Sequence, residues 1–221
     1  CDSPSSAPRL ARQDPFRVYS GSYAGRVSFR LAAVAHLNHR LFIGIEVPAS
    51  EIVSLQNNLD RLHLPIVWEK PEKLHITLNF LGRTPEDQIP QLKSLISQTI
   101  KPYNHPTFRP QFLETLYRRH DSSLVYLGLG GDVEVLKELQ KSISQTLSRL
   151  SLPSQDRFSS HITIGKLKKD DPVQTKKFLT KLADYDFTPL PPFTVDHLTL
   201  YESFLSRSGS TYQKKAKFML Q

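Results

Sequence analysis

Two copies of one short motif are the residues best suited to carry out chemistry. His75-Ile76-Thr77-Leu78 and His161-Ile162-Thr163-Ile164 each combine a histidine, an isoleucine, a threonine and a second aliphatic residue. A single His-x-Thr sequence carries little information, whereas two matched copies are not expected by chance. We interpret both copies as parts of one site.

The alternation within each motif predicts a strand with one polar face. Side chains of a strand point to alternate sides, so His75 and Thr77 face one way and their aliphatic neighbours face the other. His161 and Thr163 repeat this arrangement in the second copy. Because the aliphatic sides should anchor in a core, a pseudo-twofold relation would bring the polar faces together across a shared cleft.

Two histidines across a cleft are suited to general acid–base catalysis. Imidazole titrates near pH 6.5, so one ring can be neutral while the other is protonated. In-line attack at phosphorus needs a base on the nucleophile's side and an acid on the leaving group's side. Threonine hydroxyls can donate hydrogen bonds to a phosphate held between the rings. The residues alone leave the role of each histidine open, and a purely structural role is the alternative.

Other catalytic signatures are missing from the sequence. Its only cysteine is Cys1, and it has no His-Glu-x-x-His, Walker or dinucleotide-binding motif. The glycine-rich run 128–131 lacks the spacing of a phosphate loop, and we expect it to form the N-terminal turn of a helix. We interpret the remaining histidines as incidental; they are His36, His39, His63, His105, His120 and His197. We expect no metal ion and no other cofactor.

The composition is that of an ordinary soluble protein with a basic balance. The 221 residues are 38% hydrophobic and 23% charged, with 29 Lys and Arg against 21 Asp and Glu. The net charge of +8 favours a polyanion such as RNA, although such a surplus can also serve solubility alone. No apolar run approaches the roughly 20 residues of a membrane span. Since no intramolecular disulfide is possible, we expect a cytoplasmic protein.

Residues 1–39 differ in composition from the rest. They contain five arginines, six serines, two acidic residues and no lysine, which is typical of a transit peptide. A truncated fragment, translated upstream sequence or a misplaced start would look the same, and Cys1 would also fit a processed lipoprotein. We expect residues 1–39 to be a poorly ordered extension and residues 40–221 to be the folded domain.

The hydrophobic pattern from Arg40 onward predicts two similar halves. The expected strands are 40–47, 66–69, 74–81, 108–116, 124–129, 161–167, 193–201 and 212–220, and the expected helices are 50–62, 85–100, 133–150 and 173–183. Their order lacks a regular strand–helix–strand alternation. It favours an α+β fold with two lobes, pseudo-twofold antiparallel sheets, flanking helices and a central active-site groove.

On these residues the chain resembles the 2H phosphoesterase superfamily and, within it, the bacterial and archaeal RNA 2′,3′-cyclic phosphodiesterases, also called 2′-5′ RNA ligases. The likeness covers about residues 40–221. Besides the paired motifs, it includes the opening strand Arg40-Leu41-Phe42-Ile43, the run 67–82 around the first motif, and the closing segment 201–218.

The resemblance implies metal- and ATP-independent hydrolysis of a terminal 2′,3′-cyclic phosphate of RNA, such as that of tRNA fragments, to a 2′-phosphomonoester. His75 would donate a proton to the leaving 3′-oxygen, and His161 would accept a proton from water. Thr77 and Thr163 would hold the phosphate. ATP-independent 2′-5′ joining of RNA ends would be the reverse reaction at the same site. The partner would be RNA, not a membrane, and the protein would act as a monomer.

The chain departs from the family's pattern at three places. Asn79, expected on the polar face of the first motif, stands where members often have arginine, and Ser159-Ser160 replace Arg-Pro. Lys166 also replaces an arginine, and it would lie on the apolar side of its strand unless Gly165 forms a bulge. Fewer guanidinium groups should weaken bidentate phosphate contacts. We keep Lys166 as a candidate substrate-binding residue.

Several further expectations remain open. Phe42 is a candidate substrate-binding residue that could stack on a base, although we favour a place in the core. Arg118, Arg157 and Arg207 could contact a polyanion, although we favour solvated surface positions for them. The alternative functions are a 2H phosphodiesterase acting on small cyclic nucleotides or 2′-5′ oligoadenylate, and a non-catalytic RNA-binding module, against which the intact motifs argue.

Overall fold

The structure is a computed structural model that describes residues 37–116, 124–153, 158–167, 172–207 and 209–221. By its contacts the chain divides after Ala35, and all described elements belong to the unit His36–Gln221. Its strands are β1 (Asn38–Glu46), β2 (Ile66–Trp68), β3 (His75–Pro85), β4 (Thr107–Leu116), β5 (Leu124–Gly131), β6 (His161–Leu167), β7 (Phe193–Thr194), β8 (His197–Ser206) and β9 (Gly209–Met219).

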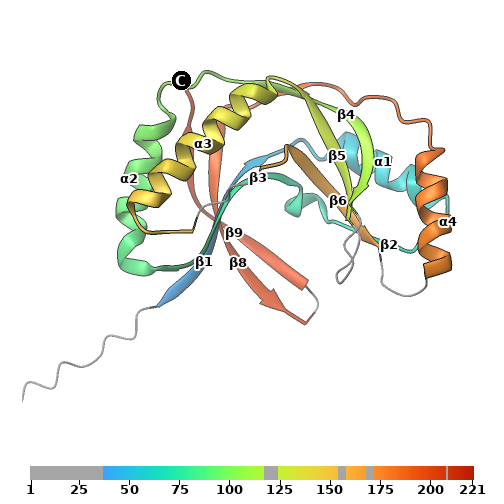
Figure 1. The fold of residues 1–221 in the computed structure, drawn as a ribbon, viewed down its shortest axis with the longest axis horizontal. Coiled ribbons are helices and arrows are strands. Elements are labelled where there is room, and N and C mark those ends of the chain that lie inside the picture. The colour runs from blue at the N-terminus through green and yellow to red at the C-terminus, as the bar shows by residue number, and fades with distance from the viewer. Residues whose placement is uncertain (1–36, 117–123, 154–157, 168–171, 208) are drawn as a thin grey trace, which may run out of the picture. The chain divides into compact units, whose positions relative to one another are not determined.

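All these strands join one antiparallel sheet. Their order is β7-β4-β5-β6-β3-β1-β8-β9, and β2 pairs with β6 at the side of this path. Figure 1 shows that the sheet is curled. The two antiparallel sheets predicted from the sequence are thus two halves of a single sheet, and the predicted α+β class is confirmed.

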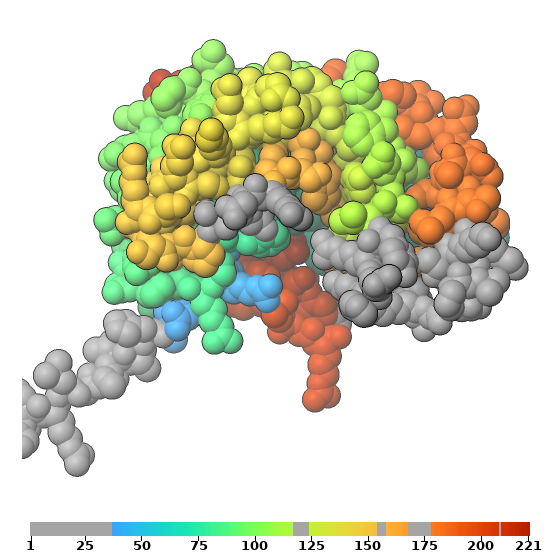
Figure 2. Space-filling model, in the orientation of Figure 1, coloured from blue at the N-terminus to red at the C-terminus, as the bar shows by residue number. Residues whose placement is uncertain are grey.

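The helices cover the outer side of the curled sheet (Figure 1). They are α1 (Ser50–Asp60), α2 (Ile89–Ile100), α3 (Val133–Arg149) and α4 (Pro172–Ala183), with short 3₁₀ turns at Pro71–Lys73 and Glu86–Gln88. In α3, Leu136, Leu139, Ile143 and Leu147 are buried at helical spacing, so this face packs on the sheet. Figure 2 shows α2 in green and α3 in yellow covering one part of the surface. None of the described helices is long and apolar enough to cross a membrane.

Some element boundaries differ from those predicted. α2 starts at Ile89 rather than at Pro85, because β3 continues through Pro85, which pairs with Asn38 at the start of β1. β1 likewise starts two residues before Arg40. The expected strand 193–201 is divided into β7 and β8, which pair with different neighbours.

The glycine-rich run 128–131 is not a helical turn. It forms the end of β5, where Gly128 pairs with Phe112 and Gly131 pairs with Phe108. Gly131 has a φ of 94°, which glycine adopts without strain, and α3 starts only at Val133. The glycines that we assigned to the N-terminal turn of the helix therefore belong to β5 and to the turn that follows it.

Candidate active site

The two motifs meet at the centre of the sheet. β3 and β6 are antiparallel, and their one paired position joins Ile76 to Ile162, the second residues of the two motifs. Both isoleucines are fully buried in the core. Continuing this register by one residue each way places His75 opposite Thr163 and Thr77 opposite His161, so the four polar side chains lie on the same side of the sheet. We call this side the inner face.

Each histidine is anchored through the same ring nitrogen. His75 Nδ1 lies 2.6 Å from the carbonyl oxygen of Lys73, and His161 Nδ1 lies 2.9 Å from that of Ser159. A carbonyl can only accept, so each Nδ1 carries the proton and donates it. This leaves Nε2 of each ring for proton transfer. In His75 it lies 2.9 Å from the Thr77 hydroxyl.

Aromatic side chains surround the two rings. Phe42 stacks on Tyr201 at 4.8 Å, and its ring centroid lies 5.0 Å from that of His75. Tyr212 meets His75 edge-on at 5.4 Å. Tyr126 meets His161 in the same way at 5.3 Å. These contacts limit ring rotation and reduce the access of water to His75.

A carboxylate and two ammonium groups set the electrostatics near His75. Glu69 binds Lys73 at 2.6 Å and Lys166 at 2.8 Å. Burial would raise the pKa of Glu69, but hydrogen bonds from the two lysines lower it below its usual value. Burial lowers the pKa of His75. The hydrogen bond to the Lys73 carbonyl and the Glu69 charge oppose this shift, and the charges of His161 and Lys73 add to it.

A one-residue bulge follows the threonine of each motif. In β3, Thr77 pairs with Gly44 and Asn79 with Ile43, so Leu78 is the extra residue. Our expectation that Asn79 shares the polar face is therefore wrong. It is fully buried, and its amide donates to the Ser144 hydroxyl of α3 at 2.7 Å. The bulge turns Asn79 to the core and Phe80 to the inner face.

The bulge in β6 decides the position of Lys166. Tyr126 pairs with Thr163 and Val125 with Gly165, so Ile164 is the extra residue. The shift places Gly165 against the buried Ile66 and returns Lys166 to the polar side, where it binds Glu69. From the sequence we required a bulge at Gly165 for Lys166 to reach the polar side, and the bulge is found one residue earlier, at Ile164.

The remaining residues singled out from the sequence are an aromatic residue, three arginines and a histidine, and they do not share one location. Phe42 is only 2% exposed, so it is buried as we favoured, but it lies among the aromatic rings of the inner face, against His75, rather than in the main hydrophobic core. Arg207 is exposed in the turn between β8 and β9, whereas Arg118 and Arg157 fall outside the described residues. His197 is not incidental, since it lies between Asp196 and Glu46.

Sequence reasoning missed the groups that orient the rings of the two motif histidines. The Lys73 and Ser159 carbonyls occupy the same position relative to each histidine, two residues before it, but a backbone carbonyl leaves no mark in a sequence. Tyr126 could have been noticed, because it lies in a predicted strand. Within the described ranges, no group of three or more His, Cys, Asp or Glu residues is placed to hold a metal ion.

Comparison with known proteins finds relatives that match most of the chain. RNA 2′,3′-cyclic phosphodiesterases of Methanocaldococcus jannaschii and Thermotoga maritima are 28% and 26% identical to 79% of this chain, over 96% and 91% of their own lengths. Escherichia coli LigT, crystallised with 3′-AMP, superposes with a TM-score of 0.64 at 21% identity, covering 84% of this chain and 99% of LigT.

A second solved structure, from Thermus thermophilus, gives a TM-score of 0.60 at 21% identity and covers 81% of this chain and 97% of that one. These likenesses extend over both halves of the sheet. The sequence profile of the 2′-5′ RNA ligase superfamily matches residues 69–203, which include both histidine motifs and more than half of the chain. The chain therefore belongs to the 2′-5′ RNA ligase superfamily.

Proposed function

We propose that the protein is an RNA 2′,3′-cyclic phosphodiesterase, which opens the terminal cyclic phosphate of an RNA to a 2′-phosphomonoester. The observation that carries the proposal is the pairing of Ile76 with Ile162, which sets two anchored histidines on one face. Membership of the superfamily and the names of the curated relatives support the same reaction.

The proposed reaction assigns one proton transfer to each histidine. Nε2 of His161 takes a proton from water as the water oxygen attacks phosphorus. The bond between phosphorus and the 3′-oxygen breaks, and Nε2 of His75 gives that oxygen a proton. The products are a 2′-phosphate and a 3′-hydroxyl. An RNA 5′-hydroxyl in place of water would give a 2′-5′ linkage by the same steps.

Neighbouring groups would hold the phosphate during this reaction. The hydroxyls of Thr77 and Thr163 donate to its free oxygens, and the ammonium of Lys166 adds positive charge. The half-buried His75 has a lowered pKa, so its acid form needs an anion nearby. A bound phosphate supplies that charge, and we infer that proton uptake by His75 accompanies substrate binding.

In this proposal residues 40–221 form the catalytic unit, and the protein acts as a monomer. It works in the cytoplasm on RNA ends such as those of tRNA fragments. Sedimentation of the purified protein and turnover of tRNA halves bearing cyclic phosphates test these assignments. A dimer, or a lack of turnover on tRNA halves with full turnover on other RNA, would contradict them.

The experiment uses a short RNA ending in a 2′,3′-cyclic phosphate, with excess EDTA and no ATP. Wild type is compared with His75→Ala, His161→Ala and the control His105→Ala, whose exposed side chain lies outside the site. Chromatography resolves 2′- from 3′-phosphate products. We expect wild type and control to form the 2′-phosphate and each catalytic variant to lose about 10²–10⁴ in rate. A 3′-phosphate product, or full activity of either catalytic variant, would overturn the proposal.

A further inference from the structure

We propose that the inner face of β1, β3, β8 and β9 binds the RNA strand that leads to the cyclic phosphate. The proposal rests on the function proposed above, and it makes a polynucleotide rather than a cyclic mononucleotide the preferred substrate. Four cations carry the argument, and we call them the basic stripe: Arg40, Arg83, Lys214 and Lys217.

Two arginines form one end of the basic stripe. Arg40 of β1 is paired directly with Arg83 of β3, and both are exposed. Their strand neighbours Leu41 and Thr84 are buried, which places the arginines on the inner face. Like charges directly opposite each other destabilise a sheet. Since neither arginine has an acidic partner among the described residues, an anion between them would relieve this repulsion.

Two lysines form the other end. Lys214 pairs with Tyr201, and Lys217 pairs with Thr199, with a bulge between them. The bulge turns both lysines to the inner face, where they reach the same carboxylate at distances of 2.5 and 3.8 Å. That carboxylate belongs to Glu46, which is paired in the sheet with His75. The lysine ammonium groups are therefore held beside the candidate active site.

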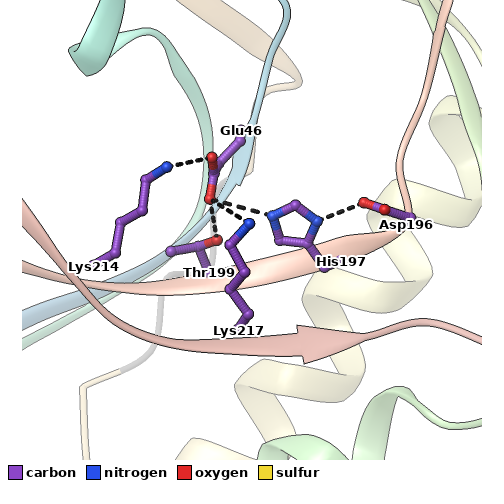
Figure 3. Close-up of polar contacts among 6 residues, drawn as sticks. All are labelled: Glu46, Asp196, His197, Thr199, Lys214 and Lys217. Carbon is purple, nitrogen blue, oxygen red and sulfur yellow. Dashed lines mark hydrogen bonds and ion pairs between the residues drawn. The ribbon is translucent and has the colours of Figure 1, made fainter.

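Figure 3 shows how this cluster is built around Glu46. Thr199 donates to its carboxylate at 2.8 Å, and His197, itself bound to Asp196, lies 3.2 Å away. Burial would raise the pKa of Glu46, but hydrogen bonds from Lys214, Thr199 and His197 lower it to about 2, so it stays charged. The two lysines remain 53% and 52% exposed, and each ammonium has three donors, so donors are left for phosphate oxygens.

Aromatic rings lie between the two ends. Phe80 is 46% exposed and packs against Phe42, whereas Tyr212 lies edge-on to His75 with the Lys73 ammonium 5.7 Å from its ring centre. Phe80 is thus the exposed ring and Tyr212 is half-buried. Aromatic rings interleaved with cations are the arrangement by which proteins bind single-stranded nucleic acid. The stretch of β1 from Arg40 to Glu46 is about 20 Å long at ~3.3 Å per residue, which suits a strand better than one nucleotide.

The test compares two double variants that lose the same charge. Arg83→Gln with Lys217→Gln removes one cation from each end of the basic stripe. Lys215→Gln with Lys141→Gln is the matched control, because Lys215 turns away to Glu202 at 3.1 Å and Lys141 is exposed on α3. Affinity for a labelled single-stranded RNA ending in 2′-phosphate is measured by fluorescence anisotropy across a salt series. Turnover is measured separately on cyclic-phosphate RNA and on a 2′,3′-cyclic mononucleotide.

We expect the stripe variant to bind RNA more weakly and the slope of log affinity against log salt to flatten by about 1.4, or roughly 0.7 for each lost phosphate contact. Its KM should rise for RNA and stay unchanged for the mononucleotide, and the control should match wild type throughout. Equal RNA affinity and slope in both variants would overturn the proposal. A wild type that binds RNA but turns over neither substrate would instead refute the proposed function, while the anisotropy still decides the role of the stripe.

Discussion

The hydrogen bond between Thr77 and His75 allows the effect of removing the Thr77 hydroxyl to be predicted in magnitude. Its atoms, Oγ1 and Nε2, lie 2.9 Å apart, and Nε2 is the nitrogen left for proton transfer. Thr77→Val keeps the β-branched shape but removes the hydroxyl that orients the ring and would donate to a bound phosphate. A hydrogen bond to a charged group contributes about 1.5–3 kcal/mol, and ~1.4 kcal/mol is a factor of ten. We therefore expect kcat/KM to fall about 10- to 150-fold.

Two comparisons separate this effect from a loss of folding. Thr77→Ser retains the hydroxyl and should keep most of the activity, whereas the valine variant should melt within a few degrees of wild type, because the side chain is half-buried and its shape is preserved. Initial rates on cyclic-phosphate RNA are measured for all three proteins. Full activity of the valine variant, or a serine variant as impaired as the valine one, would refute the reasoning.

The charges and the close packing of the site lead to three further predictions. With His75 as the acid, kcat/KM falls as the pH rises through the pKa of His75. The Glu69 charge raises this pKa and the Lys73 charge lowers it, so Glu69→Gln should move the fall to lower pH and Lys73→Gln should move it to higher pH. Shifts of both variants in the same direction in pH–rate profiles would contradict this. A Cβ at Gly44 would lie 2.9 Å from a backbone oxygen of β3 and 3.4 Å from the His75 ring. Gly44→Ala should therefore displace this ring and lower kcat by up to about 100-fold. An unchanged kcat would argue against a fixed position of the His75 ring. Glu46 has a folded pKa of about 2 against an ordinary 4.5, so its stabilising contribution is present above pH 4.5 and is lost towards pH 2. Glu46→Gln should therefore melt at a lower temperature than wild type at pH 7, and the difference in melting temperature should disappear between pH 4.5 and pH 2. A difference that stays constant with pH would refute the lowered pKa of Glu46.

The strands that carry the motifs could be predicted because their pattern is local. Period-two alternation sets His75 with Thr77 and His161 with Thr163, and the buried isoleucines between them confirm the arrangement. The bulge after each threonine was not predictable in the same way. Leu78 is an extra residue only because β1 pairs across it, and such pairing depends on partners far away in the sequence.

The charged groups around the site show the same limit. Glu46 and Lys214 are separated by 168 residues, and no periodicity connects them. Their contact depends on the order of β1, β8 and β9 in the sheet and on the bulge in β9. The Lys73 carbonyl that fixes the His75 tautomer is likewise a matter of backbone geometry. Residue types thus indicated the chemistry, whereas the neighbours that tune it appear only in the folded chain.

The division of labour between the histidines can be measured by changing the leaving group. A terminal cyclic phosphorothiolate, with sulfur in place of the bridging 3′-oxygen, expels a thiolate that needs little help from an acid. His75→Ala should regain most of its lost rate on this substrate, whereas His161→Ala should stay impaired, because water still has to lose a proton. Equal impairment of both variants on the sulfur and oxygen substrates, or rescue of His161→Ala alone, would contradict a reaction in which His75 is the acid and His161 is the base.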